Sequence, residues 1–90
     1  MEAYIPKIIH YSWFGGKEKS KFIRRCIGTW KKYLPYYDII EWNETNFDLD
    51  SHRFAKEAYE AGKYAFVSDY VRVYVIYHYG GIYFDTDLHL

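Results

Sequence analysis

The chain has 90 residues, half of them hydrophobic, and its formal net charge at pH 7 is zero. This length fits one domain over residues 1–90 with a modest core, and the neutral charge argues against a nucleic-acid-binding protein, which normally carries a basic surplus. A single cysteine excludes an intrachain disulfide, and no signal peptide or membrane-spanning apolar run is visible, so we expect a cytoplasmic protein.

Hydrophobic periodicity predicts the first three elements. Residues 7–14 are apolar and aromatic and end at a diglycine, which predicts a strand followed by a turn. Residues 22–34 repeat apolar side chains at helical spacing, and Pro35 ends this helix. Its apolar face is predicted to consist of Phe22, Cys26, Ile27, Trp30 and Leu34. Residues 37–42 indicate a short second strand.

Two helices and a strand are predicted in the remainder. Residues 52–62 indicate a short helix, residues 64–79 a longer helix capped by Gly80 or Gly81, and residues 82–88 a final strand. Strands that alternate with helices are typical of a parallel sheet, so the β-α-β-α-α-β order predicts an α/β fold. Ligands of such sheets bind at the carboxyl ends of the strands.

Two aspartates, Asp85 and Asp87, flank a threonine in the predicted last strand. Alternation of side chains along a strand would place both carboxylates on one side, together with Tyr83. Neighbouring carboxylates repel each other, and a divalent cation that also binds phosphate oxygens would relieve the repulsion. Two solvated aspartates at a strand end are the alternative interpretation.

Asp69 and Arg72 are three residues apart on the predicted long helix, so they share one face. An intrahelical ion pair is the simplest interpretation. The neighbouring residues are largely apolar, however, and a charged pair sunk among them would be costly unless it binds something specific. Arginine suits phosphate and sugar oxygens.

Trp13 lies at the end of the first strand, where it could stack on a planar base or pack in the core. The helix at 22–34 and the segment before it carry a basic face, which is either solvated or rests on an anionic membrane surface or an acidic partner. Its members are Lys17, Lys19, Lys21, Arg24, Arg25, Lys31 and Lys32. The four histidines and Cys26 show no metal-site spacing, and Cys26 is predicted to be a core residue.

Three stretches together resemble the DXD-containing glycosyltransferases of family 32. They are IPKIIHYSWFGG, YLPYYDIIEWNETNFD and AFVSDYVRVYVIYHYGGIYFDTD. That family includes bacterial transferases for capsular and cell-surface polysaccharides, and the clostridial glucosylating toxins are more distantly similar. The resemblance implies a Rossmann-like GT-A half-domain that binds a UDP- or GDP-sugar with Mn²⁺ or Mg²⁺. It also implies transfer of the sugar to a glycan acceptor with retention of configuration.

The same resemblance implies roles for individual residues. Asp85 and Asp87 would hold the metal ion and the diphosphate, and these two are expected to act in catalysis together with Asp69 and Arg72. Asp69 and Arg72 would hold the hydroxyl groups of the donor sugar. Tyr83 would contact the donor across the cleft.

Two more residues would contact the nucleotide: Trp13 would stack on the base, and Asn43 would lie near the base or ribose. The resembling proteins continue well beyond the DXD motif, so the resemblance predicts the donor-binding part of a transferase, as a truncated product, a fragment or a degenerate copy. An open sheet edge would then favour a homo-oligomer.

Two other functions stay open. One is a non-catalytic module that associates with itself or binds a partner. The other, which is weaker, is a metal-dependent hydrolase that uses Asp69, Asp85 and Asp87 as ligands.

Overall fold

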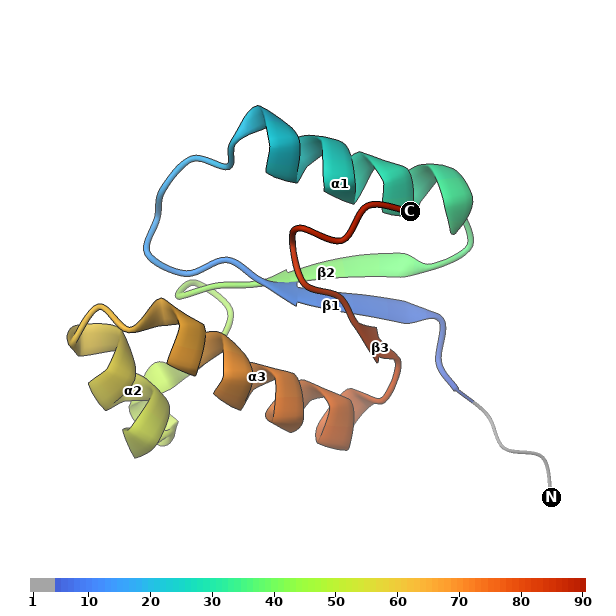
Figure 1. Cartoon of the computed structure of the whole chain (residues 1–90). Coiled ribbons are helices and arrows are strands. Elements are labelled where there is room, and N and C mark those ends of the chain that lie inside the picture. Colours follow the sequence, from blue (N-terminus) through green and yellow to red (C-terminus); the bar gives the residue numbers. More distant parts are fainter. Residues whose placement is uncertain (1–4) are drawn as a thin grey trace, which may run out of the picture.

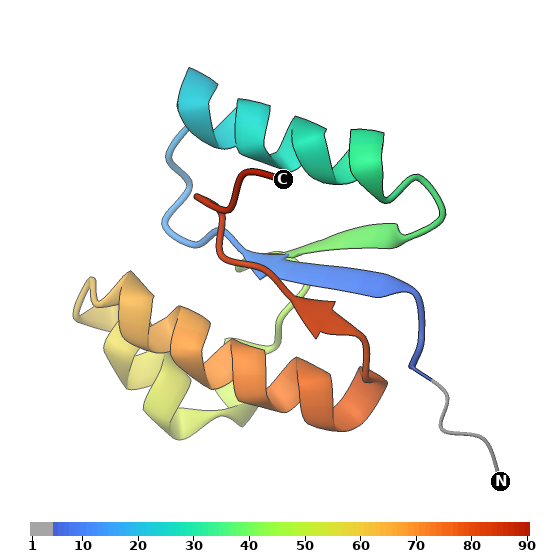
Figure 2. The same cartoon turned by 45° about the vertical axis from the view of Figure 1, so that its right-hand side comes forward.

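The computed structural model describes residues 5–90 and has an α/β architecture, as the sequence predicted (Figure 1). The elements in chain order are β1 (Ile8–Ser12), α1 (Lys21–Tyr33), β2 (Asp38–Trp42), the 3-10 helix η1 (Leu49–Ser51), α2 (Arg53–Glu60), α3 (Tyr64–Tyr79) and β3 (Ile82–Tyr83). The strands form a parallel sheet in the order β2-β1-β3. α1 lies on one face of the sheet, and α2 and α3 lie on the other (Figures 1 and 2).

β1 is the central strand, and its alternating side chains contribute to a core on each side of the sheet. On the α1 side, Ile9 and Tyr11 pack with Ile27 and Trp30. On the α3 side, the buried cluster consists of Phe14, Phe47, Val67, Val71 and Val75. The three valines recur every four residues, so one stripe of α3 faces the sheet.

Helix α1 has a clear start signal and one face in the core. The Ser20 side chain caps it by accepting a hydrogen bond from the Ile23 N–H at 3.1 Å. Cys26 and Trp30 are fully buried, which confirms two predicted core positions. The prediction for Phe22 is wrong, because this side chain is 53% exposed. Phe22 lies in the first turn of α1, at its end, whereas the buried Cys26, Ile27 and Trp30 lie in the middle and later turns.

Strand β3 is much shorter than the predicted strand over residues 82–88. It pairs with β1 at Ile82 and Tyr83, and one more ladder bond joins the Phe84 N–H to the His10 carbonyl at 2.9 Å. In this register β1 ends at Ser12, so there is little strand left for later residues to pair with. The chain instead turns, with the Leu88 N–H donating to the Asp85 carbonyl at 3.0 Å.

After this turn the chain runs back along α1 (Figure 1). The Trp30 indole Nε1 donates to the Leu88 carbonyl at 2.8 Å, and the Leu90 N–H donates to Thr29 Oγ1 at 3.0 Å. Phe84 packs edge-on against Trp30, with ring centroids 5.2 Å apart. These contacts compete with further strand pairing and hold the final residues against the helix.

The link between α3 and β3 is a glycine pair. Gly81 has φ +88°, and a Cβ at this position would lie 2.6 Å from the Ile8 carbonyl oxygen. Only glycine therefore lets β3 approach β1 this closely after the helix ends. Gly80 is the C-terminal cap of α3, as predicted, and its carbonyl bonds to His10 Nε2 at 2.8 Å.

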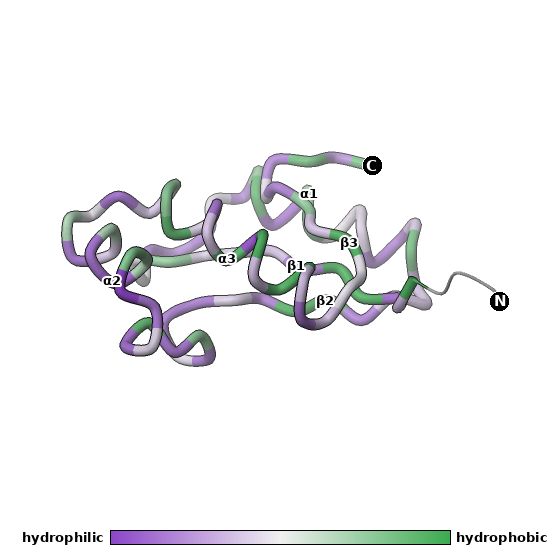
Figure 3. The backbone as a smooth tube through the Cα atoms, turned by 90° about the horizontal axis from the view of Figure 1, so that it is seen from below, coloured by the Kyte–Doolittle hydropathy of each residue, from purple (hydrophilic) through white to green (hydrophobic). Residues whose placement is uncertain are grey.

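Hydrophilic and hydrophobic stretches alternate over short distances along the backbone (Figure 3). Among residues 5–90, none of the helices combines the length and the apolar character needed to cross a bilayer.

Candidate functional site

Side chains from α3, β1, β3 and the following turn meet at the carboxyl ends of β1 and β3. Tyr83 donates its hydroxyl proton to Ser12 Oγ at 2.8 Å, which joins the ends of the two strands. The Arg72 guanidinium lies over the Tyr83 ring, 4.7 Å from its centroid. Arg72 Nη2 also contacts Asp85 Oδ1 at 2.5 Å. The structure thus brings together three of the predicted residues, Arg72, Tyr83 and Asp85.

The Tyr83 side chain contacts both the strand end and the arginine of this cluster. Burial raises its pKa, and the negative charges of Asp85 and Asp69 act in the same direction, against the opposing effects of Ser12 and Arg72. Tyr83 therefore keeps its proton at neutral pH and remains a hydrogen-bond donor. The ring gives the guanidinium a fixed aromatic platform.

The predicted alternation of Tyr83, Asp85 and Asp87 along a strand is wrong, because the strand ends at Tyr83. Asp85 and Asp87 lie in the turn that follows, and both side chains are exposed. Asp85 reaches Arg72 through the path of this turn and not through strand geometry. Such a turn leaves both carboxylates accessible to a ligand.

Asp69 and Arg72 also differ from their predicted arrangement. Both are exposed, so they are not sunk among apolar side chains. Within the described part of the chain, Arg72 forms its ion pair with Asp85 and not with Asp69. Asp69 and Arg72 are exposed because only one stripe of α3 faces the core. On the outer side of the helix even the apolar side chains of Phe66 and Val73 are 53% and 70% exposed.

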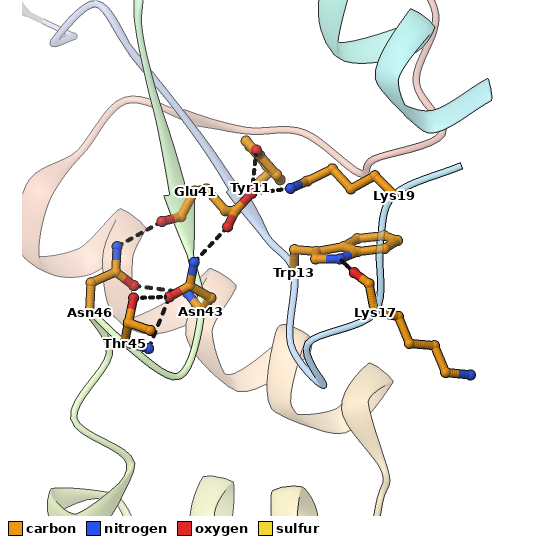
Figure 4. A network of polar contacts seen from close by, with 8 residues as sticks. All are labelled: Tyr11, Trp13, Lys17, Lys19, Glu41, Asn43, Thr45 and Asn46. Carbon is orange, nitrogen blue, oxygen red and sulfur yellow. Dashed lines mark hydrogen bonds and ion pairs between the residues drawn. The ribbon is translucent and has the colours of Figure 1, made fainter. Parts of the chain in front are cut away.

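A second polar network lies at the ends of β1 and β2 (Figure 4). Its centre is Glu41, which accepts hydrogen bonds from the Tyr11 hydroxyl at 2.8 Å and from Asn43 Nδ2 at 2.5 Å, and pairs with Lys19 at 2.5 Å. Burial alone would raise the pKa of Glu41, but the bonds from Lys19, Tyr11 and Asn43 outweigh it and lower the pKa. Glu41 is therefore a firmly ionised carboxylate.

Trp13 stands beside this network. Its indole Nε1 donates to the Lys17 carbonyl at 2.6 Å, and the Lys19 ammonium lies 5.6 Å from its ring centroid (Figure 4). The half-buried ring is thus held at the strand ends, where the Trp13 N–H donates to the Trp42 carbonyl at 2.8 Å. Ser12 and Glu41 are polar residues of this edge that the sequence prediction missed. Their positions in the sequence could have identified them, because each lies at or beside the carboxyl end of a predicted parallel strand, where ligands bind.

The carboxylate oxygens of this site suit a hard divalent cation whose other ligands come from a bound phosphate group and water. Asp85 and Asp87 offer exposed carboxylate oxygens, which Mg²⁺ and Mn²⁺ favour. Residues 5–90 contain no group of three or more His, Cys, Asp or Glu side chains placed to hold a metal ion. The three-aspartate site of the hydrolase hypothesis is therefore not assembled. One or two carboxylates completed by phosphate oxygens and water is the arrangement typical of Mg²⁺ with nucleotides.

Comparisons with known proteins point to sugar transfer. The family described as "Glycosyltransferase sugar-binding region containing DXD motif" matches residues 20–90. Inositol phosphoceramide mannosyltransferase 3 of Schizosaccharomyces pombe is 30% identical to this chain over 96% of its length. Inositol phosphoceramide mannosyltransferase 2 of the same organism is 32% identical over 96% of the chain. The chain spans about a quarter of the length of these relatives, 25% and 26% respectively. No solved structure matches the chain significantly.

Proposed function

Because the chain belongs to the family of glycosyltransferase sugar-binding regions that contain a DXD motif, we propose that it forms the donor-binding part of a GT-A glycosyltransferase. The proposed ligand is a UDP- or GDP-sugar with Mn²⁺ or Mg²⁺, and the proposed reaction is transfer to a glycan with retention of configuration. The names of the two S. pombe relatives make mannose the first sugar to test. Polysaccharide synthesis, including that of a capsule, is the proposed pathway.

One observation carries this proposal: Arg72 lies over Tyr83 and pairs with Asp85 in the turn that also holds Asp87. A cation and two carboxylates at the carboxyl ends of parallel strands can bind a sugar diphosphate and its metal ion together. Trp13 and Asn43, at the ends of the neighbouring strands β1 and β2, are the residues that we propose to contact the nucleoside.

We propose that binding exchanges the partner of Arg72. In the free chain its guanidinium neutralises Asp85. An incoming diphosphate or sugar oxygen would take over Arg72 and leave Asp85 and Asp87 to hold the metal ion. When bound, the metal would offset the charge that develops on the diphosphate leaving group. Asp69 and Arg72 would orient the sugar, and we assign the role of nucleophile to neither Asp85 nor Asp87.

Calorimetric titration tests donor binding directly. We expect GDP-mannose or a UDP-sugar to bind in the presence of Mn²⁺ and to bind weakly after chelation. Asp85→Asn and Asp87→Asn should each lower the affinity at least tenfold, because a charged metal ligand becomes neutral. Asp48→Asn, at an exposed aspartate near η1, is the matched control and should bind as the original chain does. Binding that ignores Mn²⁺ and both substitutions would refute the proposed site.

A second candidate is a non-catalytic module that associates with itself. The observation in its favour is the outer side of α3, where Phe66, Val73 and Tyr77 are 53%, 70% and 83% exposed. Burying such side chains in a dimer would remove apolar surface from water. Light scattering after size exclusion should then report a dimer that Val73→Glu converts to a monomer. A monomer at all concentrations would rule this candidate out.

A further inference from the structure

The basic charge of the chain is concentrated on α1. This helix carries five basic residues and no acidic one, although the chain as a whole is neutral. The remainder of the chain therefore has a net negative charge. Neither the fold nor the proposed donor site uses the five cations, which are Lys21, Arg24, Arg25, Lys31 and Lys32; we call them the basic face of α1.

All five basic residues lie on one side of the helix. At 100° per residue they fall within about 60° of Gly28, on the side opposite Trp30. All five side chains are exposed. Among residues 5–90, Arg24 alone of the five forms an ion pair, with Glu18 at 3.7 Å, and this pair is itself exposed. The basic face therefore presents several cations with little internal compensation along a helix about 20 Å long.

The centre of this face is open. A Cβ on Gly28 would meet nothing within 4 Å. Beside Gly28 lies a shallow pocket of about 320 Å³, whose lining includes Lys19, Arg24 and Lys31. The Lys19 ammonium already pairs with Glu41 at 2.5 Å. Arg24 and Lys31 beside this hollow can receive one anionic head group while the remaining cations of the basic face contact its neighbours.

Exposed aromatic rings stand on the flank of the same helix. Phe22 and Tyr33, in its first and last turns, are 53% and 57% exposed, and the Lys32 ammonium lies 5.4 Å from the Tyr33 ring centroid. At 100° per residue both rings lie about 120° to 140° from Gly28, outside the basic face, so the lysine stems are the part of this face that favours the boundary between a bilayer and water. Cys26 and Trp30 are already buried, so α1 cannot insert its apolar stripe.

We propose that the basic face of α1 docks on an anionic lipid bilayer. Positive charge spread over a broad helical face fits a sheet of phosphate head groups. The N-terminal end of α1 and the carboxyl ends of the strands lie at the same end of the molecule (Figure 1). The proposal does not depend on sugar transfer.

Vesicle flotation tests this docking. Phosphatidylcholine vesicles containing about one third phosphatidylserine should bind the chain at about 0.05 M salt and release it at about 0.5 M salt. Vesicles of pure phosphatidylcholine should not bind it. The triple variant Arg25→Gln, Lys31→Gln and Lys32→Gln should bind on the order of 100-fold more weakly, at about fivefold for each cation near the surface.

A matched triple variant separates the face from net charge. Lys7→Gln, Arg53→Gln and Lys63→Gln remove the same charge from exposed positions outside α1, and this variant should bind vesicles nearly as well as the original chain. Equal losses in the two variants, or no binding to anionic vesicles at low salt, would overturn the proposal. Circular dichroism of both variants confirms that they fold. Retention of an acidic protein or RNA by the same face, with no vesicle binding, would also overturn it.

Discussion

At the scale of single residues, Arg72 joins two neighbours through different properties of one side chain. Its flat guanidinium covers the Tyr83 ring and also meets Asp85. Lysine keeps the charge but lacks the planar group and its paired donors. The Arg72–Asp85 pair has side chains that are 45% and 67% exposed, so its own contribution to folding is small.

We therefore expect Arg72→Lys to separate binding from stability. The affinity for the nucleotide sugar with Mn²⁺ should fall about tenfold or more, while the free energy of unfolding changes by less than about 1 kcal/mol. Calorimetry and urea unfolding measure the two quantities. Arg53→Lys, which alters an exposed pair with Glu57 on α2, is the control and should affect neither strongly. A loss of stability that matches the loss of affinity would contradict this role.

His10 is the buried polar residue whose chemistry is most constrained. The Trp42 indole donates to His10 Nδ1 at 3.0 Å, so the neutral ring carries its proton on Nε2 and donates to the Gly80 carbonyl at 2.8 Å. A second proton would have to go on Nδ1, where it would face the indole N–H. Burial also lowers the pKa of His10 from its ordinary value of 6.5, against the effect of the Gly80 bond.

The sign of the pH dependence follows from this lowered pKa. The stability that His10 contributes is fully present above pH 6.5 and is lost as the pH falls toward its lower pKa in the folded state. We expect the free energy of unfolding in urea to decrease from pH 7.5 to pH 5.5. His10→Gln can keep both hydrogen bonds without titrating, so its stability should depend less on pH in this window. An unchanged slope would exclude His10 as the source.

At the scale of elements, the sequence predicted β1, β2, β3, α1, α2 and α3, but neither the 3-10 helix η1 nor the length of the last strand. Periodicity located α1 because one face of it is buried, and the glycine pair after residue 79 gave the predicted end of α3. The end of β3 could not be predicted in this way. The end of β3 depends on where β1 ends and on the hydrogen bond from the Trp30 indole to the Leu88 carbonyl. Both are set by tertiary contacts.

The candidate site shows the same division. The residue types Asp69, Arg72, Asp85 and Asp87 were identifiable from the motif, and the carboxyl ends of parallel strands were the expected place. The pairing of Arg72 with Asp85 instead of Asp69 was not predictable, because it needs the turn after Tyr83. Alternation of side chains along a strand therefore predicts the correct end of the sheet for Asp85 but the wrong backbone conformation around it.

The glycine link between α3 and β3 yields a stability prediction. Gly81→Ala should lower the free energy of unfolding by about 3 kcal/mol, since a strained positive φ adds about 1 kcal/mol to a clash with the Ile8 carbonyl. Gly16→Ala is the control, because Gly16 also has a positive φ but an added Cβ there meets nothing within 4 Å. It should cost only about 1 kcal/mol. Equal losses in thermal or urea unfolding would show that the approach of β3 to β1 is not tight.

At the scale of the whole molecule, β1 is shared by the two cores. Ile9 and Tyr11 face α1, while His10 faces the α3 side through its bonds to Gly80 and Trp42. Neither core can come apart without disturbing the strand that the other needs. A chain of this size should then unfold in one cooperative step.

This sharing can be tested from the α3 side. Val71→Ala removes buried methyl groups there and should lower the free energy of unfolding by about 2 kcal/mol. The urea midpoint followed by tryptophan fluorescence and the midpoint followed by far-UV circular dichroism should shift by the same amount. Two separated transitions would mean that the layers on either side of the sheet unfold independently.

The return of the chain along α1 has an optical consequence. The buried indole of Trp30 donates to the carbonyl of Leu88, directly after Asp87, and its ring packs against Phe84, directly before Asp85. Any ligand that displaces the intervening turn must alter the environment of this one fluorophore. The protein thus carries an intrinsic emission probe for occupancy of its aspartates, readable without a label in a chain where Trp13→Phe and Trp42→Phe remove the other two indoles.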